Sequence, residues 1–133
     1  MKVMEMSKTN ELKKLVNSML GEEAFVKKNG IKKTYFEVAD DEEIYPHLVF
    51  SFERINLGDL HRKDILLIVD IFDKSESSVL VENIADEVED MFNAKNLPQE
   101  KILPTFFLEN RRAVPDEDKK IRHRQIEILV QNY

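Results

Sequence analysis

The sequence predicts a mixed α/β (α+β) fold in which two helices pack on a sheet of four main strands. Three observations support this fold class. The run from Asp64 to Phe72 is apolar at consecutive positions, shorter segments alternate apolar and polar residues, and two segments repeat apolar residues at spacings of three and four. The first two patterns are typical of strands and the third of amphipathic helices. The expected order is helix, weak strand, strand, strand, helix, strand, strand.

The first helix is predicted between residues 12 and 20. Its apolar positions recur on one side and are Leu12, Leu15, Val16, Met19 and Leu20. Ser7, Thr9 or Asn10 can act as the N-cap, and Gly21 is placed to end the helix. The segment therefore presents one apolar face, which we expect to lie on the sheet.

Three strands are expected between residues 33 and 72. A weak edge strand is predicted at 33–38, between Gly30 and an acidic cluster, and the alternating segment 47–54 follows Pro46. The run 64–72 is apolar on both faces, so we expect it to be central with a layer packed on each face. A Gly-Asp turn in the connection 55–61 favours an antiparallel hairpin between these last two strands, with an exposed loop tip.

The second half of the chain predicts a helix followed by a hairpin. A capping-box pattern precedes the helix at 78–93, whose apolar stripe is Val81, Ile84, Ala85, Val88, Met91 and Phe92. Residues 102–111 and 124–130 alternate like strands, and Pro104 places the start of the first one at an edge or bulge. A long polar connection, 111–120, joins them through a Pro-Asp turn. Whether the helix links parallel strands stays open.

Length, charge and composition limit the possible functions. A chain of 133 residues suits a single domain, which we expect to span 1–133. The net charge of −6 argues against a nucleic-acid partner, and the lack of cysteine excludes disulfides and thiolate chemistry. No segment resembles a signal peptide or approaches the roughly 20 apolar residues that span a bilayer. We therefore expect a protein made in the cytoplasm that does not bind membranes.

The groups that could support catalysis do not converge in the sequence. The candidates are Glu53, Asp64, Asp70, Asp73, His47, His61 and His123. The histidines lack metal-ligand spacing, so a solvated or hydrogen-bonded role is expected for each, and no nucleophile has a base beside it. Asp70 shares a face with apolar residues and needs a partner, which could be solvent at the strand end or one of Arg54, Arg122 and Arg124. We expect no catalytic residue, cofactor or metal.

Charged segments are the stronger candidates for partner binding. The acidic face of the helix at 78–93 either is solvated or binds a basic partner. In the connection 111–120, two arginines face three acidic residues, a pattern that suits head-to-tail contact between identical subunits in a closed ring. Together with the exposed tip of the first hairpin, the predicted partner-binding residues are Arg111, Arg112, Asp116, Glu117, Asp118, His61 and Arg62.

Four stretches carry a resemblance to a known family. They are Tyr45–Phe50, the strand Ile65–Phe72 with its Val-Asp-Ile pattern, the helix Val81–Val88, and the return through Arg122-His123-Arg124 into Ile126–Val130. In these patterns the sequence resembles the tail-terminator family of tailed bacteriophages, also called tail-completion or minor tail proteins, and their relatives in prophage-derived tail-like bacteriocins. Members are small α/β proteins that form rings, usually of six copies, on the finished tail tube. They stop tube growth and provide the docking surface for the head.

The resemblance implies a structural protein rather than an enzyme. Its partners would be further copies of itself, the tail tube protein and a head-completion or neck protein. It would be found in the cytoplasm of the bacterial host during assembly and in the neck region of the virion tail afterwards. Two alternatives stay open, namely a head-completion or neck adaptor and, less favoured, a metal-dependent nuclease.

Overall fold

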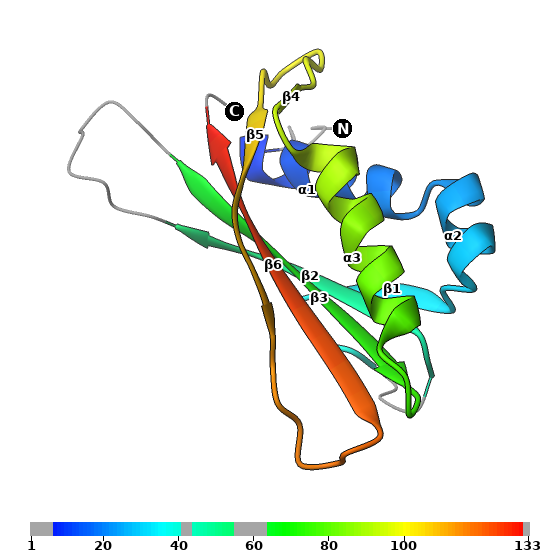
Figure 1. The fold of residues 1–133 in the computed structure, drawn as a ribbon. Helices are drawn as coiled ribbons and strands as arrows, with labels where there is room; N and C mark the ends of the chain where they lie inside the picture. Colours follow the sequence, from blue (N-terminus) through cyan, green and yellow to red (C-terminus); the bar gives the residue numbers. More distant parts are fainter. Residues whose placement is uncertain (1–6, 41–43, 55–63, 132–133) are drawn as a thin grey trace.

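The computed structural model describes residues 7–40, 44–54 and 64–131, and shows one sheet with helices on one side (Figure 1). The helices are α1 Lys8–Leu20, α2 Glu23–Asn29 and α3 Val79–Phe92. The strands are β1 Lys33–Phe36, β2 His47–Arg54, β3 Ile65–Lys74, β4 Lys95–Asn96, β5 Thr105–Ala113 and β6 Ile121–Gln131. The mixed α+β class is confirmed. The sheet has six strands rather than four main strands and one weak strand, because β4 adds two residues beside β5.

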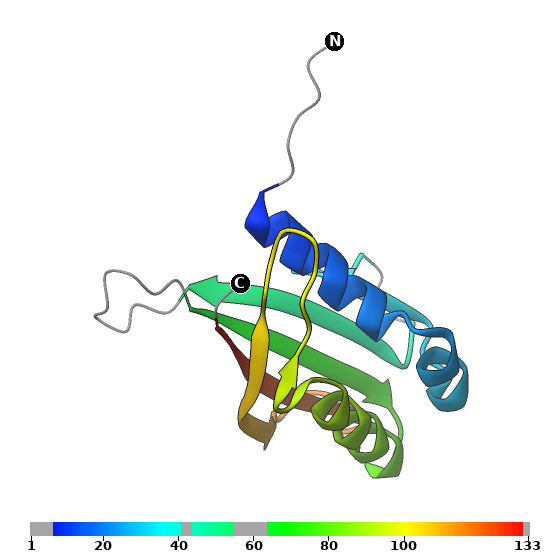
Figure 2. The same cartoon turned by 90° about the horizontal axis from the view of Figure 1, so that it is seen from above.

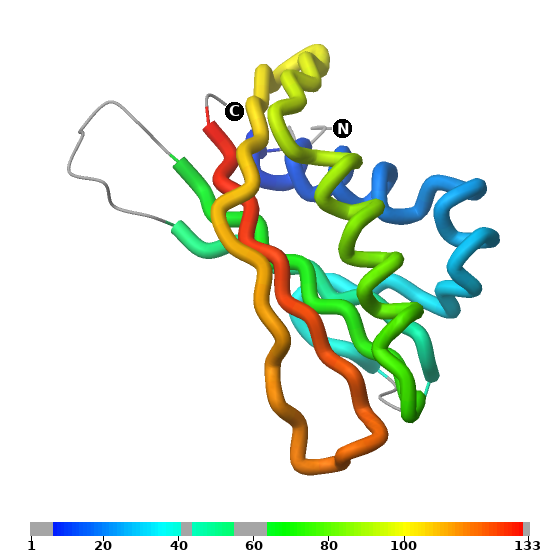
Figure 3. The backbone as a smooth tube through the Cα atoms, in the orientation of Figure 1, coloured from blue at the N-terminus to red at the C-terminus, as the bar shows by residue number. Residues whose placement is uncertain are grey.

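The strand order in the sheet is β1-β2-β3-β6-β5-β4. Both predicted hairpins, β2 with β3 and β5 with β6, are antiparallel, whereas β1 lies parallel to β2 at one edge. Because β6 is antiparallel to both β3 and β5, the strands β3 and β5 run in the same direction and α3 connects them. The chain path is easiest to follow as a tube in Figure 3.

The first helix forms as the sequence predicts. Among the three proposed N-caps, Ser7 takes the role, and its Oγ accepts a hydrogen bond from the Asn10 amide at 3.1 Å. The Gly21 amide donates to the Asn17 carbonyl at 2.9 Å, where the helix ends. The side chains of Leu12, Val16 and Leu20 are fully buried against the sheet.

A second helix, α2, was not predicted. The sequence predicts only the weak strand 33–38 between the first helix and Pro46, but Glu23–Asn29 is helical. The Glu22 carboxylate caps it by accepting hydrogen bonds from the Ala24 and Phe25 amides at 3.0 and 2.9 Å, and these bonds lower the pKa of Glu22. Gly30 ends it in the left-handed conformation, at φ 63°, which glycine adopts without steric cost.

Within the described residues, a layer packs on only one face of β3, which differs from the expected layer on each face. Ile65, Leu67, Val69 and Ile71 point toward the helices and are at most 1% exposed. All three helices lie on that side of the sheet (Figures 1 and 2), and among the described residues no helix packs on the other side. We call that other side, which carries the half-buried Leu66, Ile68, Asp70 and Phe72, the open face.

Candidate assembly surface

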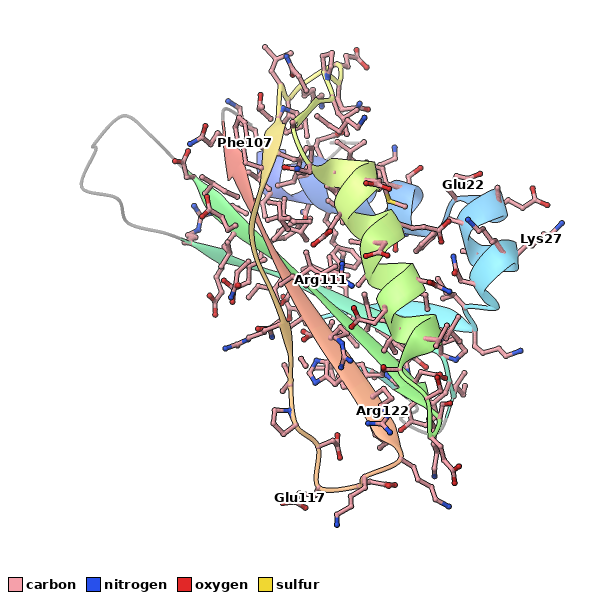
Figure 4. All side chains as sticks on the ribbon, in the orientation of Figure 1. Glu22, Lys27, Phe107, Arg111, Glu117 and Arg122 are labelled. Carbon is pink, nitrogen blue, oxygen red and sulfur yellow. The ribbon has the colours of Figure 1, made fainter. Side chains whose placement is uncertain are left out.

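The β5–β6 hairpin extends beyond the rest of the sheet (Figures 1 and 3). The Asp116 Oδ1 atom accepts a hydrogen bond from the Asp118 amide, and the Asp118 Oδ1 atom accepts one from the Lys120 amide, both at 2.9 Å. These bonds shape the turn, and Glu117 lies exposed at its tip (Figure 4). The Ser75 amide donates to the Lys120 carbonyl at 2.7 Å, which holds the end of the connection, just before β6, beside the end of β3.

Arg111 and Arg112 lie within β5 and not in the connection. A register shift between Leu108 and Asn110 adds one residue to β5, so that Arg111 turns toward α3. Its guanidinium lies 2.6 Å from carboxylate oxygens of both Glu82 and Asp86, and its side chain is 20% exposed. Arg111 therefore faces α3 and not the acidic residues of the connection, because the bulge directs its side chain to the helix. Its predicted role in partner binding stays a prediction.

Arg124 of β6 completes a charge network on α3. Its Nε atom hydrogen-bonds the Glu82 carboxylate, which Arg111 also contacts. The hydrogen bond from Arg124, followed by the charges of Arg111 and Arg124, lowers the pKa of Glu82 despite partial desolvation. Glu89 lies 3.3 Å from Arg111, and Glu87 pairs with Lys28 of α2. Much of the acidic face of α3, which was expected to be solvated or to bind a basic partner, is thus paired within the chain.

A chain of polar contacts crosses the open face from β5 to β3. The Arg112 guanidinium donates to the Gln125 Oε1 atom at 2.6 and 3.0 Å, and the Gln125 Nε2 atom donates to the Asp70 Oδ1 atom at 3.0 Å. The same Asp70 oxygen lies 2.6 Å from the His123 Nε2 atom. Asp70 is therefore held by neighbours on β6. This corrects the expectation of solvent or an arginine partner, for which the candidates were Arg54, Arg122 and Arg124.

Three rings stack across the same end of the open face. The ring of Phe72 on β3 lies between His47 and His123, with centroid distances of 4.9 and 4.1 Å. His47 is 3% exposed, and its Nδ1 atom lies 2.6 Å from the Ile44 carbonyl oxygen. Hydrogen-bonded roles, which were expected for the histidines, are confirmed for His47 and His123.

A hollow of about 470 Å³ opens above this stack. Its lining includes Glu37 and Val38, which follow β1, and Asp116 from the connection between β5 and β6. Phe72 and His123 of the ring stack line it too. Glu37 has a φ of 68°, and its amide donates to the Phe50 carbonyl at 2.8 Å, so the chain turns sharply there.

Of the seven predicted partner-binding residues, the structure describes five. Asp116, Glu117 and Asp118 lie in the projecting connection, and Arg111 and Arg112 lie on opposite faces of β5. His61 and Arg62 lie outside the described residues. Within the described ranges, there is no group of three or more His, Asp and Glu side chains suited to a metal ion. Likewise, no helix in those ranges has the length and apolar character needed to cross a membrane.

The ring stack and the hollow were not predicted from the sequence. Each residue of the stack comes from a different strand, and the register that aligns His47, Phe72 and His123 depends on β6 lying beside β3. The only signal in the sequence was the placement of Phe72 and Asp70 on one strand face. The position of Glu37 and Asp116 around one hollow had no sequence signal.

Comparison with known proteins finds similarity among solved structures. No protein-family model matches the sequence, and no curated protein matches it. Among solved structures, a chain from the virion of a native gene transfer agent particle matches with a TM-score of 0.72 and 11% identity. The two chains share a fold. The match covers 88% of this chain and 90% of the gene transfer agent chain, so it concerns the architecture as a whole and not a single motif.

Proposed function

We propose that this chain is a structural protein of a phage-like virion that forms a ring on the end of the tail tube. There it would stop tube growth and provide the surface to which the head is joined. The observation that carries the proposal is the fold shared with a chain of the gene transfer agent virion, at a TM-score of 0.72. The sequence resemblance to tail terminators supports the position at the tail end.

The open face supports a role in assembly. It exposes apolar side chains on adjacent strands in one register row, Leu66 on β3, Leu129 on β6 and Phe107 on β5, and Phe107 is 40% exposed. Ile68 lies in the next row of β3. Contiguous apolar surface of this kind marks sites of protein contact. The projecting hairpin supplies a second, charged surface whose predicted contacts are Asp116, Glu117 and Asp118.

The proposed partners are further copies of this chain, the tail tube protein and a head-completion or neck protein. A ring of identical subunits needs two different surfaces on each copy, so that one surface meets the other on the next copy. The open face and the hairpin provide two such surfaces. The proposed location is the host cytoplasm during assembly and the neck of the finished particle, and the proposed role requires no catalysis.

Size-exclusion chromatography with light scattering, on the chain alone and mixed with tail tube protein, tests this function. We expect a closed oligomer of about six copies, either in solution or bound to tube ends. Binding to a head-completion protein without any binding to tube ends would favour the neck adaptor. Magnesium-dependent cleavage of DNA that is lost in Asp70→Ala would contradict the structural role and support a nuclease.

A further inference from the structure

The outer edge of β5 is covered only near its start. The short strand β4 pairs with Thr105 and Phe106, and the Asn93 side chain accepts a hydrogen bond from the Leu108 amide at 3.0 Å. From Glu109 to Ala113, no strand among the described residues lies beside this edge. We call this stretch of β5 the free stretch.

The backbone of the free stretch alternates between β6 and the outer edge. The Val114 amide donates to the His123 carbonyl at 3.0 Å, so Val114 and, at the alternate position, Arg112 face β6. Arg111 and Ala113 therefore direct their amide and carbonyl groups away from the sheet. An edge of this kind can pair with a further strand.

The strand β1 forms the opposite edge of the same sheet, and no strand lies beyond it in the part of the chain that the structure describes (Figure 1). The Glu37 amide donates to the Phe50 carbonyl of β2 at 2.8 Å, so Thr34 and Phe36, at the alternating positions, direct their amides outward. Phe36 packs against the core, which places the side chains of both residues on the helix side of the sheet. Arg111 of β5 lies on that side too.

The two edges match in direction, face and length. β1 is parallel to β2, and the pairs β2–β3, β3–β6 and β6–β5 are antiparallel, so β1 runs opposite to β5. A second copy beside the first, with its helices on the same side, brings its β1 antiparallel to the free stretch. The outward residues of both edges then carry side chains on one face, as neighbouring strands require. β1 spans Lys33–Phe36, nearly the length of Glu109–Ala113.

The charges along the two edges are complementary in this direction. Lys32 and Lys33 are exposed at the start of β1, and Glu37 is exposed just after its end. Arg112 is exposed within the free stretch, and Asp116 lies exposed beyond its end. Antiparallel pairing places the two lysines toward Asp116 and Glu37 toward Arg112. Parallel pairing would bring like charges together, which is unfavourable.

We propose that β1 of one copy pairs antiparallel with the free stretch of β5 in a second copy, so that the sheet continues from subunit to subunit. Backbone hydrogen bonds supply the pairing, as in other cases of strand addition, and Lys33 against Asp116 sets its direction. Because the two edges are different surfaces, the contact is head to tail and closes a ring when the rotation between copies permits. The inference rests on the proposed ring and specifies which two edges join its subunits.

A proline at the free edge of the full-length chain tests the backbone pairing. Ala113→Pro removes an amide that points away from β6, and proline is tolerated on the outer side of an edge strand, so the fold should persist. Self-association in sedimentation measurements, with tail tube protein present, should weaken at least about tenfold because a hydrogen bond of the contact is lost. Ala113→Ser is the matched control, since it keeps the amide, and its effect should stay within about twofold.

A charge exchange tests the direction of the contact and leaves the backbone unchanged. Lys33→Glu and Asp116→Lys should each weaken association at least about fivefold, because like charges then meet. The double variant should recover most of the loss, since every contact in the ring then contains the exchanged pair. Glu100→Lys is the control for charge, because Glu100 is exposed in the connection from β4 to β5, at the other end of β5 from Asp116. Its effect should stay within about twofold.

The outcomes separate the contact from the ring. Undiminished association of a folded Ala113→Pro chain, or no recovery in the double charge variant, would overturn the inference and leave the ring itself standing. Circular dichroism shows whether Ala113→Pro is folded, and if it is not, the charge exchange alone decides. A wild-type chain that forms no oligomer, even with tail tube protein present, would contradict both the inference and the proposed function.

Discussion

Replacing the two neighbouring arginines of β5 one at a time should have very different effects on stability. Arg111 contacts three carboxylates on α3, those of Glu82, Asp86 and Glu89, at 2.6, 2.6 and 3.3 Å. Arg112 points to the open face, where it contacts the neutral side chain of Gln125. Arg111→Leu should therefore remove a link between the sheet and α3, and Arg112→Leu should not.

The size of the difference follows from the exposure of the partners. The side chains of Glu82, Asp86 and Glu89 are 43%, 65% and 24% exposed, so solvent screens each ion pair. Pairs of this kind contribute about 0.2–1 kcal/mol each, which gives about 1–2 kcal/mol for the loss of Arg111. The exposed Arg112 should contribute less than about 0.5 kcal/mol.

Urea unfolding followed by circular dichroism measures both variants. We expect Arg111→Leu to lower the urea concentration at the unfolding midpoint. The slope of the unfolding free energy against urea concentration should stay unchanged, so that the shift of the midpoint reports stability alone. High salt should reduce the difference between the variants, because it screens partly exposed charges. Equal effects of the two substitutions would refute the assignment of Arg111 to the α3 network and the bulge that places it there.

Three further predictions concern the core and the acid response. Leu67→Ala should cost about 2–5 kcal/mol by opening a cavity, and Leu66→Ala on the open face about 1 kcal/mol, a contrast that chemical denaturation will detect. Val69→Asp should prevent folding, seen as loss of the far-ultraviolet dichroism signal, because it buries an unpaired charge. The pKa of Glu82 is lowered below its ordinary 4.5, so its stabilisation is complete above that pH and is lost as the pH falls through the lowered value. The melting temperature of Glu82→Gln should therefore fall less on acidification than that of the wild type.

Local patterns in the sequence predicted most of the elements. Apolar residues recur at spacings of three and four in α1 and α3 and at every second position in β2 and β6. Each pattern reflects one buried face and can be recognised within a single segment. The uninterrupted apolar run of β3 correctly indicated the central strand, but it was read as burial on both sides. Leu66 and Ile68 are half-buried by neighbours within the sheet and have no helix above them among the described residues.

The short helix α2, the bulge in β5 and the hollow could not be predicted, because none of them follows from the periodicity of apolar residues. The helix α2 has only seven residues, and its N-cap is a glutamate, a residue type outside the usual N-cap set. The bulge in β5 reverses the alternation after Leu108, so Arg111 faces α3 and Arg112 the open face, whereas both arginines were expected in the connection. The predicted contacts at Asp116, Glu117 and Asp118 stay predictions. The lining of the hollow includes Glu37, Phe72 and Asp116, which come from three segments that are distant in the sequence. Only the order of the strands in the sheet brings these segments together.

Electron microscopy of particles produced with and without this chain tests its proposed role most directly. The particles should come from the genome that encodes the chain, with its gene deleted and then supplied again. We expect the deletion to give tail tubes of excessive and variable length without heads, and the restored chain to give tails of uniform length with a ring at the head-proximal end. Tails of normal length that are joined to heads in the absence of the chain would contradict the proposed function.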